Sequence, residues 1–249
     1  MNRRNFFRKT ALAGAAAISI PEIANAAIAD SNSANWHSLS PNEIILFQGD
    51  SITDNGRNRN EENQANKQSQ LGNGYVLFTA ANILANHPKK DLKIYNRGIG
   101  GHKVFQLAER WDKDCIDLQP NLVSILIGVN DFWHTKGDYT GTVVEYENDY
   151  RALLTRTKKE LPGVKIVICE PFIIHGGSAL DESWEKDFAP YRNVVKALAR
   201  EFDLTFVPFQ AVFNEALKKA PAAYWGGDGV HPSMAGAQLM AQAWLKAVL

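Results

Sequence analysis

The sequence predicts a three-layer α/β/α domain built on a five-stranded parallel sheet. Short runs of apolar and β-branched residues recur along the chain and alternate with longer segments whose apolar residues have helical spacing. Such alternation is typical of a parallel sheet with helices on both faces. The length of 249 residues suits one large domain, and a hydrophobic content of 45% is ordinary for a globular protein.

Five runs are interpreted as buried strands because each is short, apolar and rich in β-branched residues. They are residues 44–47, 92–95, 122–127, 164–169 and 204–207. Five segments have the apolar spacing of helices, namely residues 75–86, 104–111, 143–160, 191–202 and 235–248. Together these elements predict a single domain over residues 43–249.

Composition and charge exclude several classes of protein. Lysine plus arginine equals aspartate plus glutamate at 27 each, and no long basic stripe interrupts the sequence. An electrostatic footprint for nucleic acid is therefore missing, and no nucleic-acid partner is expected. Cys115 and Cys169 are too few for a disulfide framework or a structural zinc site, so both are interpreted as core residues, with a single disulfide between them as the alternative.

Residues 1–26 are interpreted as an export signal. The paired Arg3 and Arg4 precede an Ala-rich apolar run, and small residues end the segment at Ala26. The pattern resembles a twin-arginine signal, with an ordinary secretion signal as the alternative. The apolar run is too short for a permanent span, so we expect no stable membrane insertion and a periplasmic or extracellular location. Residues 27–42 are expected to be a polar lead outside the domain.

The first predicted strand leads into the sequence GDS, which ends at Ser51. In open parallel sheets ligands bind at the carboxyl ends of the strands. A serine there can present its hydroxyl and backbone N–H at a helix end, as a nucleophile must, although a helix N-cap is the simpler alternative. Residues 53–72 then form a long polar connection, of a kind that belongs either to function or to disorder.

Two further turns offer hydrogen-bond donors. The second strand leads into residues 96–101, NRGIGG, whose glycines let the backbone approach a ligand. The third leads into residues 128–131, GVND, where the amide of Asn130 could donate to an anionic oxygen or simply form an Asn-Asp turn. The glycine turn lacks the order of a dinucleotide or phosphate loop, so no such cofactor is expected.

Asp228 and His231 precede the last predicted helix in the sequence DGVHP. A spacing of three residues on a turn can place the carboxylate beside the imidazole Nδ1. The carboxylate would then fix the tautomer and stabilise the imidazolium that forms when the histidine takes a serine proton.

Together the GDS, NRGIGG, GVND and DGVH turns, in this order, resemble the SGNH hydrolases, also called the GDSL esterase family. The resemblance covers nearly the whole mature chain and implies a flavodoxin-like fold. It implies Ser51 as nucleophile, His231 as general base and Asp228 as the acid that orients it. Ile52 stands where many members have leucine, which is a conservative difference.

The resemblance also implies an oxyanion hole made by the N–H groups of Ser51 and Gly101 and the amide of Asn130. Gly101 is chosen because the glycine of the hole in this family closes the turn that begins here at Asn96. Asp50 and Asp131 are expected to support their turns rather than to take part in chemistry. The implied reaction is a two-step acyl transfer through an acyl-enzyme, without a metal or other cofactor.

The sequence says less about the substrate. The segment GNGY at residues 72–75 and Trp133 resemble the subgroup that includes carbohydrate O-acetyl esterases. Trp133, Tyr224 and Trp225 flank the motifs and are candidate sugar platforms, with loop anchoring as the alternative. No long apolar lid is evident, which disfavours a long-chain lipase. We expect a small-molecule or polysaccharide ester with a short acyl group, above all acetyl, and a lysophospholipase or thioesterase reaction is the alternative.

Two other classes of function stay open. His102, His134, His175 and His231 fall near strand ends, and Asp50, Asp131 and Asp228 are nearby, which allows a metal-dependent hydrolase. No His-x-His or His-Glu-x-x-His spacing supports it, and no metal is expected. The other class is a non-catalytic carbohydrate-binding module on the same fold, against which the intact serine, histidine and aspartate argue. The sequence leaves the oligomeric state open.

Overall fold

The computed structural model describes residues 19–28 and 37–249. Its centre is a sheet of five parallel strands in the order β2-β1-β3-β4-β5. The strands are β1 (Ile44–Gly49), β2 (Lys93–Asn96), β3 (Leu122–Leu126), β4 (Lys165–Cys169) and β5 (Thr205–Val207). This is the flavodoxin-like order that the sequence predicted.

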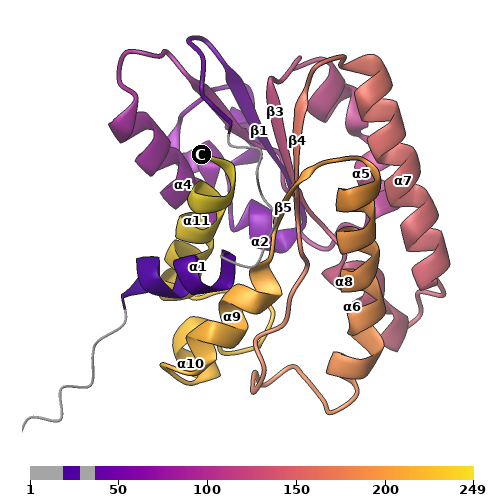
Figure 1. Ribbon diagram of the computed structural model, residues 1–249. Helices are drawn as coiled ribbons and strands as arrows, with labels where there is room; N and C mark the ends of the chain where they lie inside the picture. The colour runs from indigo at the N-terminus through magenta and orange to yellow at the C-terminus, as the bar shows by residue number, and fades with distance from the viewer. Residues whose placement is uncertain (1–18, 29–36) are drawn as a thin grey trace, which may run out of the picture.

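Helices cover both faces of the sheet (Figure 1). One layer holds α1 (Ile20–Ile28), α4 (Tyr75–Asn86), α9 (Phe209–Leu217) and α11 (Met234–Val248). The other holds α5 (Val104–Glu109), α7 (Val143–Glu160) and α8 (Trp184–Glu201). Shorter elements are α2 (Ser51–Asp54), η1 (Arg59–Glu61), α3 (Gln68–Leu71), η2 (Asp112–Ile116), α6 (Val129–Trp133), η3 (His134–Lys136) and α10 (Ala222–Trp225). The predicted three-layer α/β/α architecture is confirmed.

The two central strands are buried on both faces. Every residue of β3 is buried, as are all but the first of β1. Polar side chains within them find partners: the Trp244 indole donates to Ser124 Oγ at 2.9 Å, and Gln48 Nε2 donates to the Asp114 carbonyl at 2.7 Å. The ends of β1 and β3 are therefore held in a closely packed core.

The helices α8 and α9 on the two faces of the sheet differ from the prediction. α8 begins at Trp184 rather than at residue 191 and runs through Pro190, because Trp184 and Phe188 extend its buried apolar face toward the N-terminus. Their burial outweighs the one hydrogen bond that a proline inside a helix removes. α9 was not predicted, although Phe209, Val212, Phe213 and Ala216 have helical spacing and are all buried. The sequence of this segment therefore does carry a helix signal.

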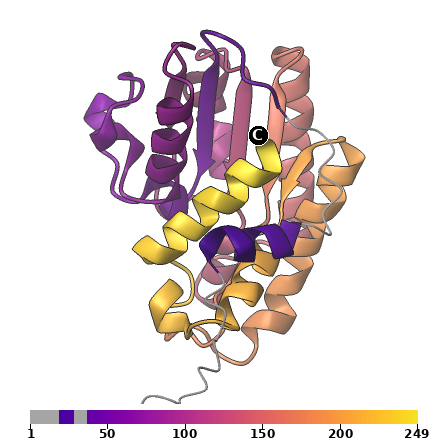
Figure 2. The ribbon, with the colours of Figure 1, turned by 60° about the vertical axis from the view of Figure 1, so that its left-hand side comes forward.

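The helix α1 spans the predicted cleavage position after Ala26. Figure 2 shows it lying across α11, and it also packs against α9, with Ile23, Ala24, Ala27 and Ile28 buried. Arg3 and Arg4 lie outside the described residues, so the export signal stays a prediction. Residues 37–42 of the predicted lead also contact the domain, since Leu39 is buried and His37 Nε2 lies 2.8 Å from Glu43 Oε2.

Both cysteines are buried and free, as expected of core residues. Across residues 19–28 and 37–249, every helix is too short or too polar to cross a membrane.

The long polar connection after α2 is fastened to the edge strand β2. The side chain of Asn66 accepts a hydrogen bond from Ile94 N at 2.8 Å and donates to the Leu92 carbonyl at 2.7 Å. The Asn66 backbone N–H also donates to the Ile94 carbonyl at 3.1 Å. Glu62 forms ion pairs with Arg97 at 3.2 Å and Lys113 at 2.7 Å. The segment is therefore part of the scaffold.

Replacing Asn66 by alanine should lower the free energy of unfolding by about 1–3 kcal/mol. The change removes both side-chain hydrogen bonds and puts alanine at a φ of 62°. Urea denaturation measures the loss. The control is Asn60→Ala, at an exposed asparagine of the same segment, which should stay within about 0.5 kcal/mol of wild type. Equal midpoints for the two variants would contradict the anchoring role.

Candidate active site

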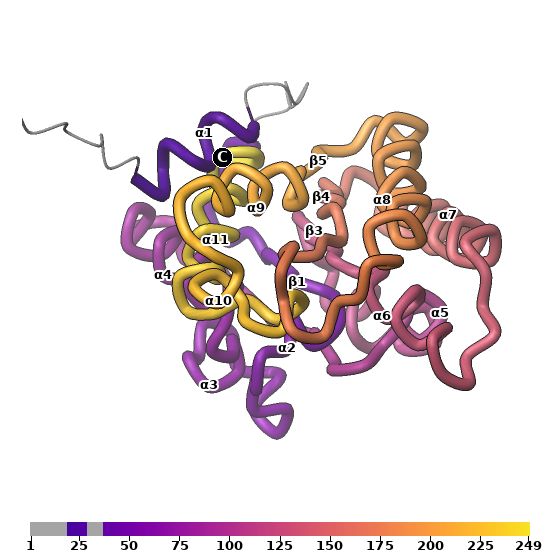
Figure 3. Tube along the Cα trace, turned by 90° about the horizontal axis from the view of Figure 1, so that it is seen from below, coloured from indigo at the N-terminus to yellow at the C-terminus, as the bar shows by residue number. Residues whose placement is uncertain are grey.

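The predicted site residues meet at the carboxyl ends of the central strands, the end of the sheet seen in Figure 3. Ser51 begins α2 directly after β1, and Asn130 lies in α6 just after β3. These two strands are neighbours, and the chain leaves them toward opposite edges of the sheet. A crevice forms at such a switch point, and this crevice is where ligands bind in open α/β sheets.

Ser51, His231 and Asp228 are hydrogen-bonded in series. Ser51 Oγ lies 2.8 Å from His231 Nε2, and His231 Nδ1 lies 2.7 Å from Asp228 Oδ2. An ionised carboxylate only accepts hydrogen bonds, so it fixes the proton on Nδ1 and leaves Nε2 to accept from the serine hydroxyl. The spacing of three residues seen in the sequence therefore does bring the carboxylate to the imidazole.

The carboxyl group of Asp228 is held in its ionised form. Its burial favours the neutral acid, but hydrogen bonds from the His231 side chain and from the backbone N–H groups of His231 and Val230 outweigh burial, so the pKa of Asp228 lies below its ordinary value. The two backbone bonds to Oδ1 measure 2.7 and 2.8 Å. The negative charge beside the imidazole is thus secured by the turn itself.

Two backbone N–H groups beside the serine are free. Within the described part of the chain, neither Ser51 N–H nor Gly101 N–H donates to an acceptor. The other glycines of the turn are engaged: Gly98 N–H bonds to a side chain of its own turn at 2.8 Å, and Gly100 N–H bonds to Asp54 Oδ2 at 3.1 Å. Gly101 has a φ of 80°, and a Cβ added to it would meet no other part of the described structure within 4 Å. Gly101 is therefore the glycine with a donor to offer.

The amide of Asn130 is oriented by the same turn. Its Nδ2 donates to the carbonyl of His102 at 3.2 Å, and Asn130 is only 5% exposed. One amide hydrogen is used in this way and fixes the amide plane, which leaves the second hydrogen for another acceptor. Burial and the positive charges of Arg110 and Arg59 lower the pKa of His102, so its ring is neutral at pH 7.

Two buried carboxyl groups support the turns. Asp50 accepts from Ile52 N at 2.9 Å, and Asp131 Oδ1 accepts from Val104 N at 3.0 Å. Burial raises the pKa of each to about 7, and the charge of Asp50 adds to the rise at Asp131. Asp131 Oδ2 is buried and has no hydrogen-bond partner among the described residues.

Arg110 and Asp54 also hold the site together, and the sequence analysis did not single them out. Arg110 donates to the Arg97 carbonyl at 2.7 Å and to the Gly49 carbonyl at 3.3 Å, which joins the turns after β1 and β2. Asp54 accepts from Gly100 N–H and pairs with Arg59 at 2.6 Å. The position of Asp54 three residues after Ser51 was a usable signal. Arg110 stands near the end of an amphipathic helix, where its sequence position is the same as that of an ordinary solvent-exposed arginine.

The predicted aromatic residues occupy different environments. The Trp133 ring is partly exposed, with its centroid 6.4 Å from that of the His231 ring. Tyr224 is 56% exposed. Trp225 is only 3% exposed, and its indole N–H donates to the Ala216 carbonyl at 3.1 Å. The prediction of Trp225 as a sugar platform is therefore wrong, because this ring anchors the turn that precedes Asp228.

The histidines proposed as metal ligands are not gathered. Among the described residues, no group of three or more His, Cys, Asp or Glu side chains is placed to hold a metal ion. His231 is engaged with Ser51 and Asp228, and His175 Nε2 lies 3.3 Å from Glu185 Oε2. The described residues thus contain no cluster of metal ligands of the kind that the metal-dependent alternative requires.

Comparisons with known proteins agree with the fold and the site. Residues 47–239 match the model of the GDSL-like lipase/acylhydrolase family. An acetylxylan esterase of Geobacillus stearothermophilus is 37% identical over 214 residues, which are 83% of this chain and 94% of that protein.

Solved structures agree as well. A GDSL-like lipase from Parabacteroides merdae has 53% identity and a TM-score of 0.83, covering 85% of this chain and 98% of its own. The crystal structure of the Geobacillus acetylxylan esterase has 36% identity and a TM-score of 0.77, covering 85% and 96%.

The fold, the site and these relatives define a carboxylic ester hydrolase. More closely, the chain belongs to the GDSL-like lipase/acylhydrolase family.

The raised pKa of Asp131 predicts how stability depends on pH. The pKa of this carboxyl is about 7 in the folded protein against an ordinary value of 3.8. Between pH 3.8 and about pH 7 the folded state binds more protons than the unfolded state. The carboxyl group of Asp131 therefore lowers the free energy of unfolding progressively as the pH rises through this range. Asp131→Asn removes this loss. The free energy of unfolding of the variant, relative to wild type, should therefore rise with pH, by up to about 4 kcal/mol.

Urea denaturation at pH 4.5 and pH 7.5 measures this difference. Asp117→Asn, at an exposed carboxylate, is the control and should show no such rise. A difference between the Asp131 variant and wild type that stays constant across the two pH values would refute the assignment.

Proposed function

We propose that this enzyme is a serine esterase that removes short acyl groups, above all acetyl, from a carbohydrate. The observation that carries the proposal is the hydrogen-bonded series from Ser51 through His231 to Asp228, beside the free N–H groups of Ser51 and Gly101. A nucleophile, its base and anion-binding donors are the parts that acyl transfer requires.

In the first step Ser51 Oγ attacks the ester carbonyl while its proton passes to His231 Nε2. Asp228 stabilises the imidazolium that results. The carbonyl oxygen becomes an anion and accepts hydrogen bonds from the N–H groups of Ser51 and Gly101 and from the free amide hydrogen of Asn130. The alcohol then leaves with the proton from Nε2, and the acyl group stays on Ser51.

In the second step water takes the place of the alcohol. His231 Nε2 removes a proton from the water as it attacks the acyl-enzyme, and the same donors stabilise the second oxyanion. Collapse of this intermediate returns the proton to Ser51 Oγ and releases the carboxylic acid. Both steps use the same three side chains, and neither needs a redox change.

The relatives support these roles and the acetyl group. Variants of the Geobacillus enzyme described as catalytic mutants replace a serine, an aspartate and a histidine three residues after the aspartate. Asp228 and His231 have the same spacing here. That enzyme is described as an acetylxylan esterase and an acetyl-xylooligosaccharide esterase. The partly exposed Trp133 beside His231 also suits a sugar.

The test is hydrolysis of p-nitrophenyl acetate, butyrate and octanoate by wild type, with and without a chelator, and by two variants. Ser51→Ala should lose nearly all activity because the attacking oxygen is gone. Asn130→Ala should lower kcat by about 10²–10³ because one oxyanion donor is gone. The acetate ester should be preferred, and chelation should change nothing.

Each part of the proposal can fail separately. Activity of Ser51→Ala equal to wild type would overturn the nucleophile, and loss on chelation would favour a metal. A preference for octanoate would favour the lipid acyl hydrolase over the acetylesterase. Binding of sugars without turnover would favour the non-catalytic module.

We also propose that the enzyme is exported, on the strength of the sequence of residues 1–26. Export would give an esterase of polysaccharides access to substrates outside the cytoplasm. Intact-mass measurement of protein recovered from a periplasmic or culture-medium fraction should show a chain that starts just after Ala26. Full-length protein confined to the cytoplasm of a host with a twin-arginine pathway would contradict export.

A further inference from the structure

A shallow surface cavity of about 460 Å³, largely open to solvent, lies next to Trp133. It is lined by Trp133, His134, Lys136, Gly137, Asp138 and Tyr139. The Trp133 ring connects the cavity to the triad, with its centroid 6.4 Å from that of the His231 ring. We propose that this cavity binds the sugar units next to the acetylated one, an inference that rests on the proposed function.

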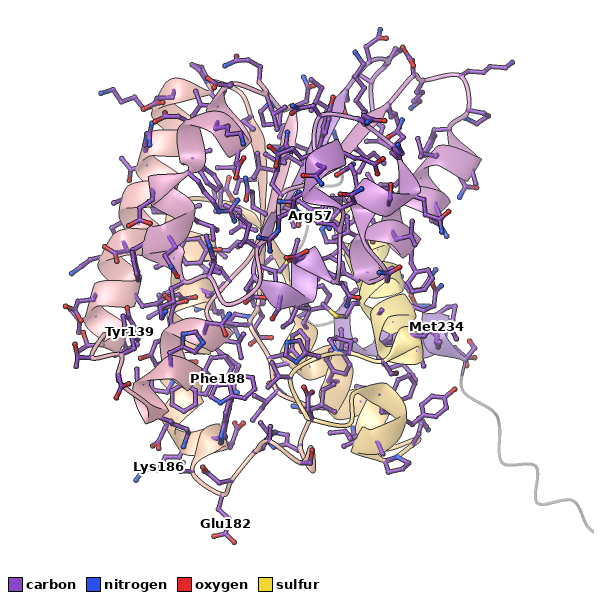
Figure 4. The ribbon with its side chains drawn as sticks, turned by 180° about the vertical axis from the view of Figure 1, so that it is seen from behind. Arg57, Tyr139, Glu182, Lys186, Phe188 and Met234 are labelled. Carbon is purple, nitrogen blue, oxygen red and sulfur yellow. The ribbon has the colours of Figure 1, made fainter. Side chains whose placement is uncertain are left out.

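Two aromatic rings bound the cavity, and the structure holds both in place. Trp133 packs edge-on against the buried Trp184 at 5.4 Å. Tyr139 stacks on Phe105 with centroids 6.3 Å apart and planes 21° from parallel. Figure 4 shows Tyr139 near the left-hand edge of the molecule, with Phe188 further inside. Rings fixed in advance lose little conformational entropy when a ligand binds.

Lys103 contributes to this arrangement. Its side chain is nearly buried, and its Nζ lies 4.6 Å from the Tyr139 ring centroid and 5.8 Å from that of Phe105. Among the described residues, no carboxylate lies within ion-pair distance of this ammonium. A buried cation without an anionic partner is unfavourable unless aromatic faces compensate it. Lys103 thus ties the Tyr139 ring to the start of α5.

The polar groups of the cavity suit hydroxyl groups. The imidazole of His134 and the carboxylate of Asp138 have no hydrogen-bond partner within the described residues. Burial and the charge of Lys103 lower the pKa of His134, so the ring is neutral and both donates and accepts. Lys136, by contrast, is bound to Asp181 at 3.0 Å and to a serine hydroxyl at 2.8 Å.

A glycan matches this combination because a pyranose ring has apolar C–H faces and a rim of hydroxyl groups. The faces pack on aromatic rings, and the hydroxyls bond to groups that donate and accept. Trp133 lines the cavity and also lies beside the His231 ring, whereas the buried Trp225 offers no face to a ligand. The chain of the substrate therefore extends from His231 past Trp133 toward Tyr139.

The test compares kcat/KM for p-nitrophenyl acetate with that for acetylated xylo-oligosaccharides of two and of six units. Tyr139→Ala should lower kcat/KM for the six-unit substrate about tenfold, through KM, because one aromatic face is lost. It should leave p-nitrophenyl acetate unchanged and affect the two-unit substrate less. Tyr139→Phe, which keeps the ring, should behave as wild type.

Tyr224→Ala is the matched control, because it removes an exposed tyrosine that does not line the cavity. It should leave all three substrates unchanged. A loss for the six-unit substrate in this variant but not in Tyr139→Ala would place the glycan at Tyr224 instead and overturn the proposal. Equal losses for all substrates in Tyr139→Ala would mark a structural defect rather than a subsite, and no loss at all would also overturn it.

Failure of the proposed function would look different. Wild-type enzyme that cleaves p-nitrophenyl acetate but no acetylated oligosaccharide would overturn both the carbohydrate substrate and the subsite. Equal kcat/KM values of wild type and Tyr139→Ala for the oligosaccharides would overturn the subsite alone.

Discussion

The site depends on the guanidinium of Arg110, which holds two strand ends at a fixed separation. It donates to the carbonyl of Gly49, two residues before Ser51, and to the carbonyl of Arg97, in the turn that ends at Gly101. The proposed oxyanion donors belong to different turns, so their spacing is set by whatever joins the turns. Donors displaced by a fraction of an ångström stabilise an oxyanion poorly, and such a brace is therefore needed.

Acidic partners offset the cost of burying this charged brace. Arg110 pairs with Asp114 at 2.7 Å, and the neighbouring Arg97 pairs with Glu62 at 3.2 Å. Glu62 lies in the long polar connection after α2. That segment therefore supplies the negative charge that pairs with the buried Arg97. Removing one partner of a buried pair leaves an uncompensated charge, which is strongly unfavourable. The polar composition of the connection thus reflects a structural task, and residues 53–72 need not move over the substrate.

Much of the fold and of the site could be predicted because the signals were local. The strands are short apolar runs, and Ser51, Asn130 and the pair Asp228 and His231 stand in turns whose spacing alone limits what they can reach. What could not be predicted depends on contacts between distant segments. Trp225 and Trp133 look alike in the sequence, yet one is buried and the other faces the site, since exposure is decided by tertiary packing. The packing of α1 on α9 and α11 is of the same kind.

The reacting groups and the proposed sugar-binding cavity come from different parts of the chain. The reacting groups lie in turns tied to the core of the sheet, whereas the cavity toward Tyr139 is built from one stretch of chain that begins at Trp133, the last residue of α6. A change in that stretch alters what binds without moving Ser51, His231 or Asp228, because none of the bonds that position the three passes through it. Surface loops on a rigid scaffold tolerate such change. One fold can therefore serve different esters, with chemistry fixed at the strand ends and specificity set beside them.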